Sequence, residues 1–279
     1  MRGLRPGAVV SEEPEREVAR WGDGDDRLGH EMAELVGRLS AEDDMDRETR
    51  GRLLGRFARL LAASARRAGA AGVGRGRWLT DTFMEIAPHV PVRDLETLSR
   101  HHDGLRGEAL ADSLVRAAQR ATTGVGAAGG ALAAIQFTAP PLLLTAPAQI
   151  LAETVVVGTI EVKLIAELHE VYGVQVPGSG TARGMVFLQL WAGQRGFDPL
   201  QPGSVTAALG VAAKAGLRKR LLRTFGRHFT TLGPFLTGAV AGGALNNAAT
   251  RRLAEKVRDD LRGQHVEELR RPPSIEGGG

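Results

Sequence analysis

The chain has 279 residues, with 36 lysines and arginines against 32 aspartates and glutamates, 37 glycines, 4% aromatic residues and no cysteine. The absence of cysteine excludes a disulfide framework, a cysteine-ligated zinc site, an iron–sulfur cluster and thiol catalysis. Hydrophobic residues at 43% and charged residues at 24% are typical of a globular protein and exclude wholesale disorder.

Charge is divided unevenly along the chain. The segment Ser11–Glu48 contains 14 acidic residues against five arginines, a balance of −9, whereas Thr49–Gly279 carries +11. An acidic N-terminal segment before a basic remainder suggests either that the acidic segment masks the basic part of the same chain or that the basic part binds an anionic partner. A solvated, arginine-rich surface explains the same numbers without a partner.

We expect three regions in the chain: a mobile acidic tail at residues 1–27, one helical domain at 28–263, and a mobile tail at 264–279. The basic start is not a signal peptide, because its apolar run ends at once in Ser11-Glu-Glu-Pro. We therefore expect a cytoplasmic protein.

The first half of the domain shows helical periodicity. Between His30 and Ala68, apolar residues recur at helical spacing in two runs, and Ser40 is predicted to cap the second of these helices. The glycine-rich stretch Gly69–Gly76 is predicted to be a linker, and a short amphipathic helix is predicted over Trp78–Ile86.

Further helical turns are predicted from Val92, and a longer helix opens at Gly107. No window alternates strictly between apolar and polar residues, so a sheet has no support. The predicted fold is an all-α multi-helix bundle with a Gly/Ala/Pro-rich apolar helical hairpin and a Gly-rich C-terminal helix.

The middle of the chain has no charged residue from Ala121 to Ala152. Its length would allow a membrane span, but glycines and prolines interrupt it. Three interpretations stay open: a buried helical hairpin in a bundle, a re-entrant or interfacial membrane element, and two true spans. The apolar residues of this predicted hairpin are Phe137, Pro140, Pro141, Leu142, Leu143, Leu144 and Pro147.

A helix is predicted over Ala146–Tyr172, with ionisable residues inside an apolar run. At 100° per residue these groups do not gather on one face, so some of the carboxylates should be partly buried. If the protein is an enzyme, Glu153, Glu161 and His169 are the acid/base candidates. Eight residues of helix separate the two carboxylates by about 12 Å along the axis, too far for both to act on one bond.

A second low-charge run, Phe229–Thr250, follows a basic segment. It contains Gly238-Ala-Val-Ala-Gly242, a small-residue spacing that would form a dimerisation face in a strongly apolar span. Because Thr, Gly and Asn dilute the apolar character of this run, we expect tight packing inside one bundle instead. The basic segment has the composition that an anionic lipid surface attracts, although a solvated basic helix face is the alternative. Its predicted surface-binding residues are Arg218, Lys219, Arg220, Arg223, Arg227, Phe225 and Phe229.

Motifs for established chemistry are missing. His169-Glu170 lacks the second histidine of a metalloprotease helix, and Gly124-Val-Gly-Ala-Ala-Gly follows a polar helix and not a strand. The pair His101-His102 is a poor metal site, because adjacent side chains diverge on a helix. We predict no cofactor and no metal, and nucleic acid is not favoured as a partner because the basic segment has no stacking platform.

Four segments of the chain, in order, resemble the EcsC family of bacterial proteins. A helix with a glycine-rich turn starts at Leu114, and the proline-bounded segment Thr-Ala-Pro-Pro-Leu-Leu-Leu-Thr-Ala-Pro-Ala-Gln starts at Thr138. A helix that ends in Tyr-Gly starts at Ile160, and a Gly-rich final helix with Asn near its end starts at Gly233. The resemblance covers about Leu110 to Asp260. Where the family commonly has an acid after its Pro-Ala pair, this chain has Gln149.

The resemblance implies association with membranes or membrane transport systems, because the founding member is encoded beside an ABC transporter. It implies no established reaction and no catalytic residues. We therefore expect a membrane-associated accessory or lipid-interacting helical protein, more a non-enzyme than an enzyme, peripheral on the inner face of the cell membrane. Its expected partner is membrane lipid or a membrane transport protein. The alternatives are a hydrolase that uses buried carboxylates on a membrane-derived substrate, and a soluble helical protein-interaction module.

Overall fold

The computed structural model describes residues 27–40, 45–74, 92–138, 146–178, 180–194 and 234–270, together with residues 78, 82, 86 and 90. Within these ranges all regular structure is helical, which confirms the all-α prediction. A helix at residues 27–40 is followed by α2 (Arg47–Gly74), α4 (Leu95–His101), α5 (Gly107–Thr138), α6 (Ala146–Tyr172), α7 (Gly180–Gln194) and α9 (Pro234–Arg270).

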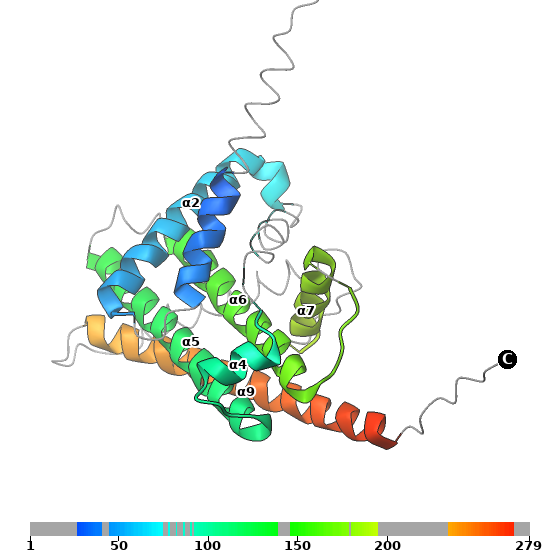
Figure 1. Ribbon diagram of the computed structural model, residues 1–279. Coiled ribbons are helices and arrows are strands. Elements are labelled where there is room, and N and C mark those ends of the chain that lie inside the picture. The colour runs from blue at the N-terminus through cyan, green and yellow to red at the C-terminus, as the bar shows by residue number, and fades with distance from the viewer. Residues whose placement is uncertain are drawn as a thin grey trace, which may run out of the picture.

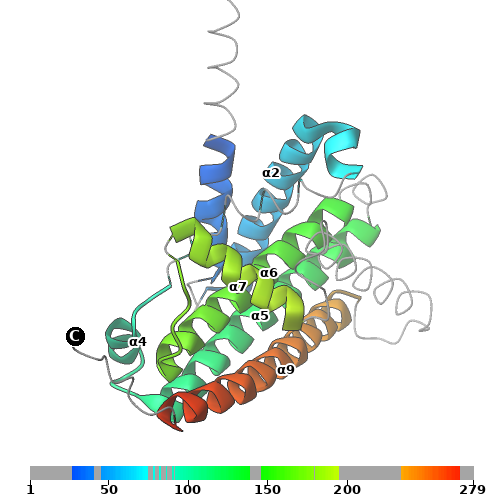
Figure 2. The ribbon, with the colours of Figure 1, turned by 90° about the vertical axis from the view of Figure 1, so that its right-hand side faces the viewer.

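Three long helices, α5, α6 and α9, form the centre of the bundle (Figures 1 and 2). Helix α5 is antiparallel to both of its neighbours. Against α9, Thr122 lies opposite Thr250 and Glu108 lies opposite Arg262. Against α6, Gly129 lies opposite Gln149 and Glu108 lies opposite Tyr172. Helix α2 packs against α5 and α6, and α7 packs on α6 and touches α9. The helix of residues 27–40 lies beside α2 (Figure 2).

The hydrophobic core draws on all these layers. Side chains with at most 1% of their surface exposed come from the first helix, α2, α5, α6 and α7, for example Leu39, Phe57, Leu110, Ile165 and Leu188. Burying a side chain of this size contributes about 1.5–3 kcal/mol to folding. The apolar positions predicted to form helix faces between His30 and Ala68 do face this core.

Two local predictions at helix ends are wrong. Ser40 does not cap α2, because its hydroxyl donates backward to the Val36 carbonyl at 2.7 Å, within its own helix. Instead the Asp46 carboxylate accepts a hydrogen bond from the Thr49 backbone N–H at 2.9 Å and caps α2. The predicted linker from Gly69 is helical to Gly74 and is broken only at Gly69, whose φ of 68° suits glycine.

The C-terminal helix is longer than predicted. Helix α9 continues to Arg270, past the expected domain boundary at residue 263, whereas residues 1–26 and 271–279 lie outside the described part of the chain. Of the predicted helix over residues 78–86, Trp78, Thr82 and Ile86 are described, and all three are helical and buried.

Helices α5 and α9 are in direct backbone contact. A Cβ atom on Gly126 would lie 2.5 Å from the Gly242 carbonyl oxygen, and one on Gly242 would collide with the carbonyl oxygen of Gly126. The two backbones therefore touch directly, which only glycine allows here. The prediction that this small-residue run packs inside one bundle is confirmed for Gly242.

The predicted apolar hairpin is observed as far as it is described. Helices α5 and α6 pack against each other, and residues of α5 up to position 130 and of α6 from 149 onward contribute buried side chains. The side chains of residues 133–147 lie outside the described part, and so do the hairpin positions named above. None of the described helices is both long enough and apolar enough to cross a bilayer.

The glycine contact leads to the first prediction. The substitution Gly126→Ala should lower the free energy of unfolding by about 1–3 kcal/mol, because the new methyl group meets backbone and not a movable side chain. Urea denaturation followed by circular dichroism measures the change.

Gly55→Ala on α2 is the matched control. A Cβ at Gly55 meets nothing within 4 Å, so this helical substitution should raise the free energy of unfolding by about 0.5–1 kcal/mol. Equal effects of the two substitutions would show that the α5–α9 contact carries no packing constraint.

Candidate functional site

Helix α6 carries a row of buried ionisable side chains. Glu153, Glu161, Glu167 and His169 are each at most 7% exposed. This confirms the prediction that carboxylates of this helix are buried. A buried carboxylate needs donors or a cation nearby, so the partners of each decide what it does.

Glu161 is fully buried and receives hydrogen bonds from two other helices. Trp191 Nε1 of α7 donates to Glu161 Oε2 at 2.8 Å. The Thr250 hydroxyl of α9 lies 3.1 Å from Glu161 Oε1 and 3.0 Å from the Thr122 hydroxyl of α5. Because a hydroxyl has one proton, Thr250 donates to one of these oxygens at a time. Glu161 thus links α6 to α7 and α9, and Thr250 lies between this carboxylate and Thr122 of α5.

Glu153 is held near the start of α6. Gln149 Nε2 donates to Glu153 Oε1 at 3.0 Å and to the Gly129 carbonyl oxygen of α5 at 2.8 Å. The carboxylate lies directly over Gly129, where a Cβ atom would collide with it. A carboxylate at position 149 would have no amide N–H to donate to these two oxygens.

His169 lies against α7, with its ring edge-on to Phe187 at 5.3 Å between centroids. Its Nδ1 is 2.7 Å from the Ile165 carbonyl oxygen, an acceptor, so Nδ1 carries the proton of this bond. Burial lowers the pKa of His169, and the nearby Arg183 guanidinium lowers it further, against the opposing effect of the Ile165 hydrogen bond. The lowered pKa favours the neutral form of this imidazole.

The three predicted acid/base candidates are not brought together. Glu153, Glu161 and His169 have separate partners, and eight residues of helix, about 12 Å, separate each from the next. The structure gives them no common site. In the described part of the chain no group of three histidine, aspartate or glutamate side chains is placed to hold a metal ion.

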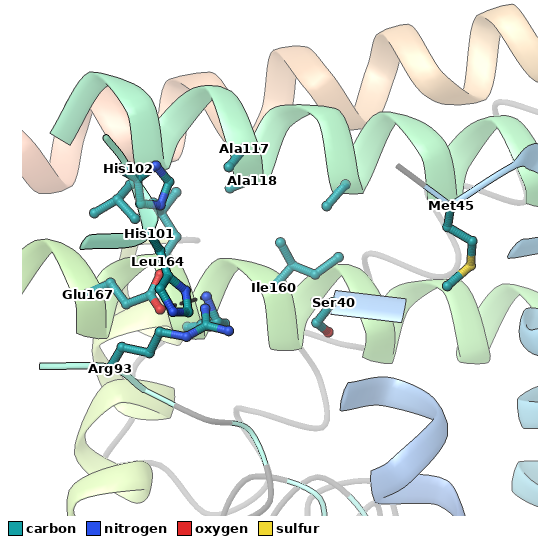
Figure 3. A pocket seen from close by; sticks show the side chains of 13 residues that line it. Ser40, Met45, Arg93, His101, His102, Ala117, Ala118, Ile160, Leu164 and Glu167 are labelled. Atoms are coloured by element: carbon teal, nitrogen blue, oxygen red, sulfur yellow. Dashed lines mark ion pairs between the residues drawn. The ribbon is translucent and has the colours of Figure 1, made fainter. Parts of the chain in front are cut away.

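A cavity of about 540 Å³ lies between the end of the first helix, α4, α5 and α6 (Figure 3). Its polar lining residues are Ser40, Arg93, His101, His102, Lys163 and Glu167. Its apolar lining residues are Met45, Leu114, Ala117, Ala118, Ala121, Ile160 and Leu164. This cavity is the candidate binding site, because it combines room for a ligand with charged groups at its wall.

Sequence reasoning did not predict this cavity. The spacing of Lys163 and Glu167, four residues apart on a helix, was a signal for their ion pair, whose Nζ–Oε1 distance is 2.6 Å. The sequence positions of His101 and His102 indicate only a poor metal pair, whereas both line the cavity. No pattern in the sequence indicates a role for Arg93, because only the packing of α4, which follows it, places this side chain at the cavity.

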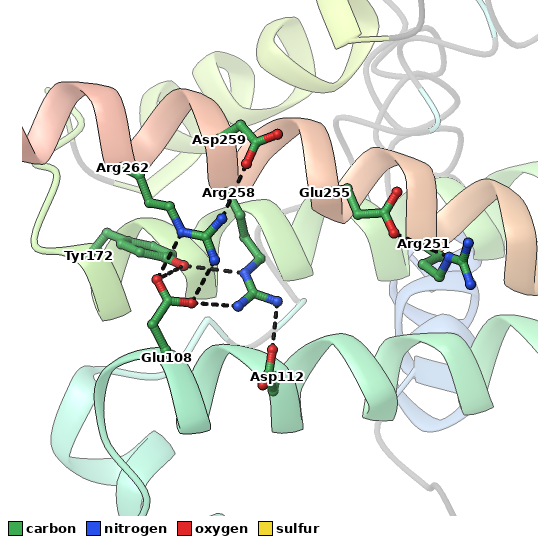
Figure 4. A network of polar contacts seen from close by, with 8 residues as sticks. All are labelled: Glu108, Asp112, Tyr172, Arg251, Glu255, Arg258, Asp259 and Arg262. Carbon is green, nitrogen blue, oxygen red and sulfur yellow. Dashed lines mark hydrogen bonds and ion pairs between the residues drawn. The ribbon is translucent and has the colours of Figure 1, made fainter.

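A second polar cluster joins α5, α6 and α9 at the end of the bundle where α5 begins and α6 ends (Figure 4). We call it the charged clamp; its residues are Glu108, Asp112, Tyr172, Arg258 and Arg262. Arg262 donates to both oxygens of Glu108, at 2.9 and 2.8 Å, and Tyr172 donates to Glu108 Oε1 at 2.9 Å. Arg258 donates to Glu108 Oε2 at 2.5 Å and to Asp112 at 2.7 Å. The hydrogen bonds from Arg262 lower the pKa of Glu108 to about 2 against partial burial, helped by those from Arg258 and Tyr172.

The predicted surface-binding residues between Arg218 and Phe229 lie outside the described part of the chain. Comparison with family models, with curated proteins and with solved structures finds no match.

The network around Glu161 leads to the second prediction. The variant Glu161→Ala leaves the Trp191 N–H and the Thr250 hydroxyl without this acceptor and should lower the free energy of unfolding by about 3 kcal/mol. The isosteric Glu161→Gln keeps an acceptor for Trp191 and should cost about 1 kcal/mol. Chemical denaturation of both variants measures the difference, and equal losses would contradict the hydrogen-bond assignment.

The charged clamp leads to the third prediction. Because the folded-state pKa of Glu108 lies below its ordinary value of 4.5, the clamp stabilises the fold above pH 4.5 and loses that contribution as pH falls toward 2. Since Glu108 is half exposed, solvent screening should limit the contribution to about 1 kcal/mol.

Urea denaturation between pH 3 and 6 tests this expectation. Glu108→Gln should show a weaker loss of stability on acidification than the wild type, and Glu48→Gln, an exposed position at the start of α2, should keep the wild-type profile. Identical pH profiles for Glu108→Gln and the wild type would contradict it.

Proposed function

We propose that the protein is a membrane-associated accessory protein that interacts with lipid at the inner face of the cell membrane, as its resemblance to the EcsC family implies. The supporting observation is the place of the low-charge segments in the fold. Residues 121–138 of α5, 146–152 of α6 and 234–250 of α9 contain no charged residue. The antiparallel packing gathers all three segments at one end of the bundle.

The two ends of the bundle therefore differ in polarity. The charged clamp holds Glu108, Asp112, Arg258 and Arg262 at one end (Figure 4). The uncharged segments of α5, α6 and α9 lie toward the other end, where the charged side chains packed on α5 are Arg50 against Gly124 and Glu153 against Gly129. Uncharged helix costs little to dehydrate, so this end suits contact with a lipid surface better than the clamp does. Helix α5 ends, and helices α6 and α9 begin, at this end of the bundle.

The sequence adjoining this end has the composition of a lipid-binding element. Residues 139–145 connect α5 to α6 and include the predicted proline-bounded apolar stretch, while the basic segment precedes α9 in the chain. Each basic residue near an anionic leaflet contributes about 1 kcal/mol of attraction. Apolar contact and basic charge together are the two signals that peripheral attachment requires.

Two other functions remain as alternatives to this proposal. A hydrolase would need the buried carboxylates of α6 to share a substrate, and their separate hydrogen bonds give no support to that arrangement. A soluble protein-interaction module predicts no affinity for vesicles, and the experiment below distinguishes it.

The fourth prediction concerns vesicle binding. The full chain should cosediment with vesicles containing anionic phospholipid and bind neutral phosphatidylcholine vesicles much more weakly. Binding should fall as salt rises, because the basic segment acts through screened charge. Replacing Arg218, Lys219, Arg220, Arg223 and Arg227 by glutamine should reduce binding by about 10-fold or more.

The matched control replaces five exposed arginines elsewhere, which lowers the net charge by the same amount. These are Arg47, Arg59, Arg66, Arg116 and Arg252. The control should keep most of the vesicle binding. No cosedimentation at low salt, or equal loss in both variants, would contradict the proposal.

A further inference from the structure

The cavity has two chemically different ends (Figure 3). Arg93, His101, His102 and Glu167 gather at one end, whereas Ser40 and Met45 lie at the other. Between them the wall is made by Ala117, Ala118 and Ile160, among other apolar residues. A space with one charged end and an apolar wall matches a molecule with a charged head and a hydrocarbon tail.

The charges at the polar end do not cancel. Lys163 and Glu167 neutralise each other, because their ion pair is short and their side chains are 14% and 3% exposed. In the described part of the chain Arg93 has no carboxylate partner, so its guanidinium leaves one net positive charge at the cavity wall. A single guanidinium binds a carboxylate with two parallel hydrogen bonds.

The histidines can add donors beside this charge. The Nδ1 atom of His102 lies 2.9 Å from the Ser113 hydroxyl, which fixes the orientation of its ring at the wall. His101 is on the surface side and has no hydrogen bond to another described side chain. An imidazole donates at least one hydrogen bond in either protonation state, so an anion at Arg93 has further donors within the same end of the cavity.

Small residues of α5 make the room for a tail. Ala117, Ala118 and Ala121 follow one another along the cavity face of this helix, opposite Ile160 and Leu164 of α6. Larger side chains at these alanines would fill the space between the two helices. The apolar wall then favours hydrocarbon, at about 25 cal/mol for each Å² removed from water.

We propose that this cavity binds a single-chain carboxylate amphiphile, with the carboxylate at Arg93 and the chain along the alanines of α5. One net positive charge matches a monoanionic head. Apart from Ala121, the cavity uses none of the residues on which the proposed membrane attachment rests. This inference therefore goes beyond that function, and the two can fail separately.

The fifth prediction tests the head group. Isothermal titration calorimetry of the full chain should show binding of decanoate, no measurable binding of acetate or inorganic phosphate, and binding of decanol and decylamine at least about 10-fold weaker than decanoate. Tighter binding of decyl phosphate than of decanoate would overturn the carboxylate assignment. Equal binding of decanol would overturn the role of charge.

Two variants place the ligand in the cavity. Arg93→Gln should weaken decanoate binding by about 10-fold or more, while Arg116→Gln, an exposed arginine on α5 away from the lining, should not change it. Ala118→Leu should fill the tail site and weaken decanoate binding, with exposed Ala248→Leu on α9 as its control. Circular dichroism checks that each variant is folded.

The outcomes separate this inference from the proposed membrane attachment. Arg93→Gln should bind anionic vesicles as the wild type does, because Arg93 lies in the cavity and outside the basic segment. Decanoate binding that is unchanged in both Arg93→Gln and Ala118→Leu would overturn the cavity proposal, whatever the vesicle result.

Discussion

The direct contact between the backbones of α5 and α9 at Gly126 and Gly242 sets the geometry of the bundle. With no side chain between them, the two helices lie close enough for Asn246 to reach the Thr122 carbonyl at 3.1 Å and for Asn247 to reach the Thr123 hydroxyl at 3.1 Å. Short polar side chains span only a small gap, so these bonds require the glycine contact. The same register of α9 against α5 places Thr250 next to Glu161, and it places Arg258 and Arg262 next to Glu108.

Buried charge gives α6 its central position. Carboxylates in a low-dielectric interior are costly, and they are retained only where donors meet them. Trp191 of α7 and Thr250 of α9 supply those donors to Glu161, so each neighbouring helix is fixed in register as well as packed. Apolar packing fixes register through the fit of side chains, and hydrogen bonds to a buried carboxylate add a directional constraint. The carboxylates of α6 therefore specify the arrangement more than they add to stability.

The difference in charge between the two ends of the bundle and the charge at the cavity wall have different structural origins. The uncharged end results from two low-charge runs, far apart in sequence, that antiparallel packing brings together. The cavity results from α4, which carries two histidines to α5 and α6 next to the lysine–glutamate pair. The first feature suits contact with a surface, and the second suits one small molecule, so the chain has two separate means of interacting with amphiphiles.

Sequence by itself determined the helical class, the bounds of α6 and the burial of its carboxylates, because helical periodicity and the mixing of charge with apolar residues are local properties. It also indicated that the glycine-rich runs pack closely inside the bundle. The sequence did not determine whether Ser40 or Asp46 caps α2, since both side chains can form local hydrogen bonds in more than one way. Only the tertiary structure decided the charged clamp, the partners of Glu161 and the cavity at Arg93. Each joins residues from separate helices, and no spacing along the chain encodes which faces of those helices meet.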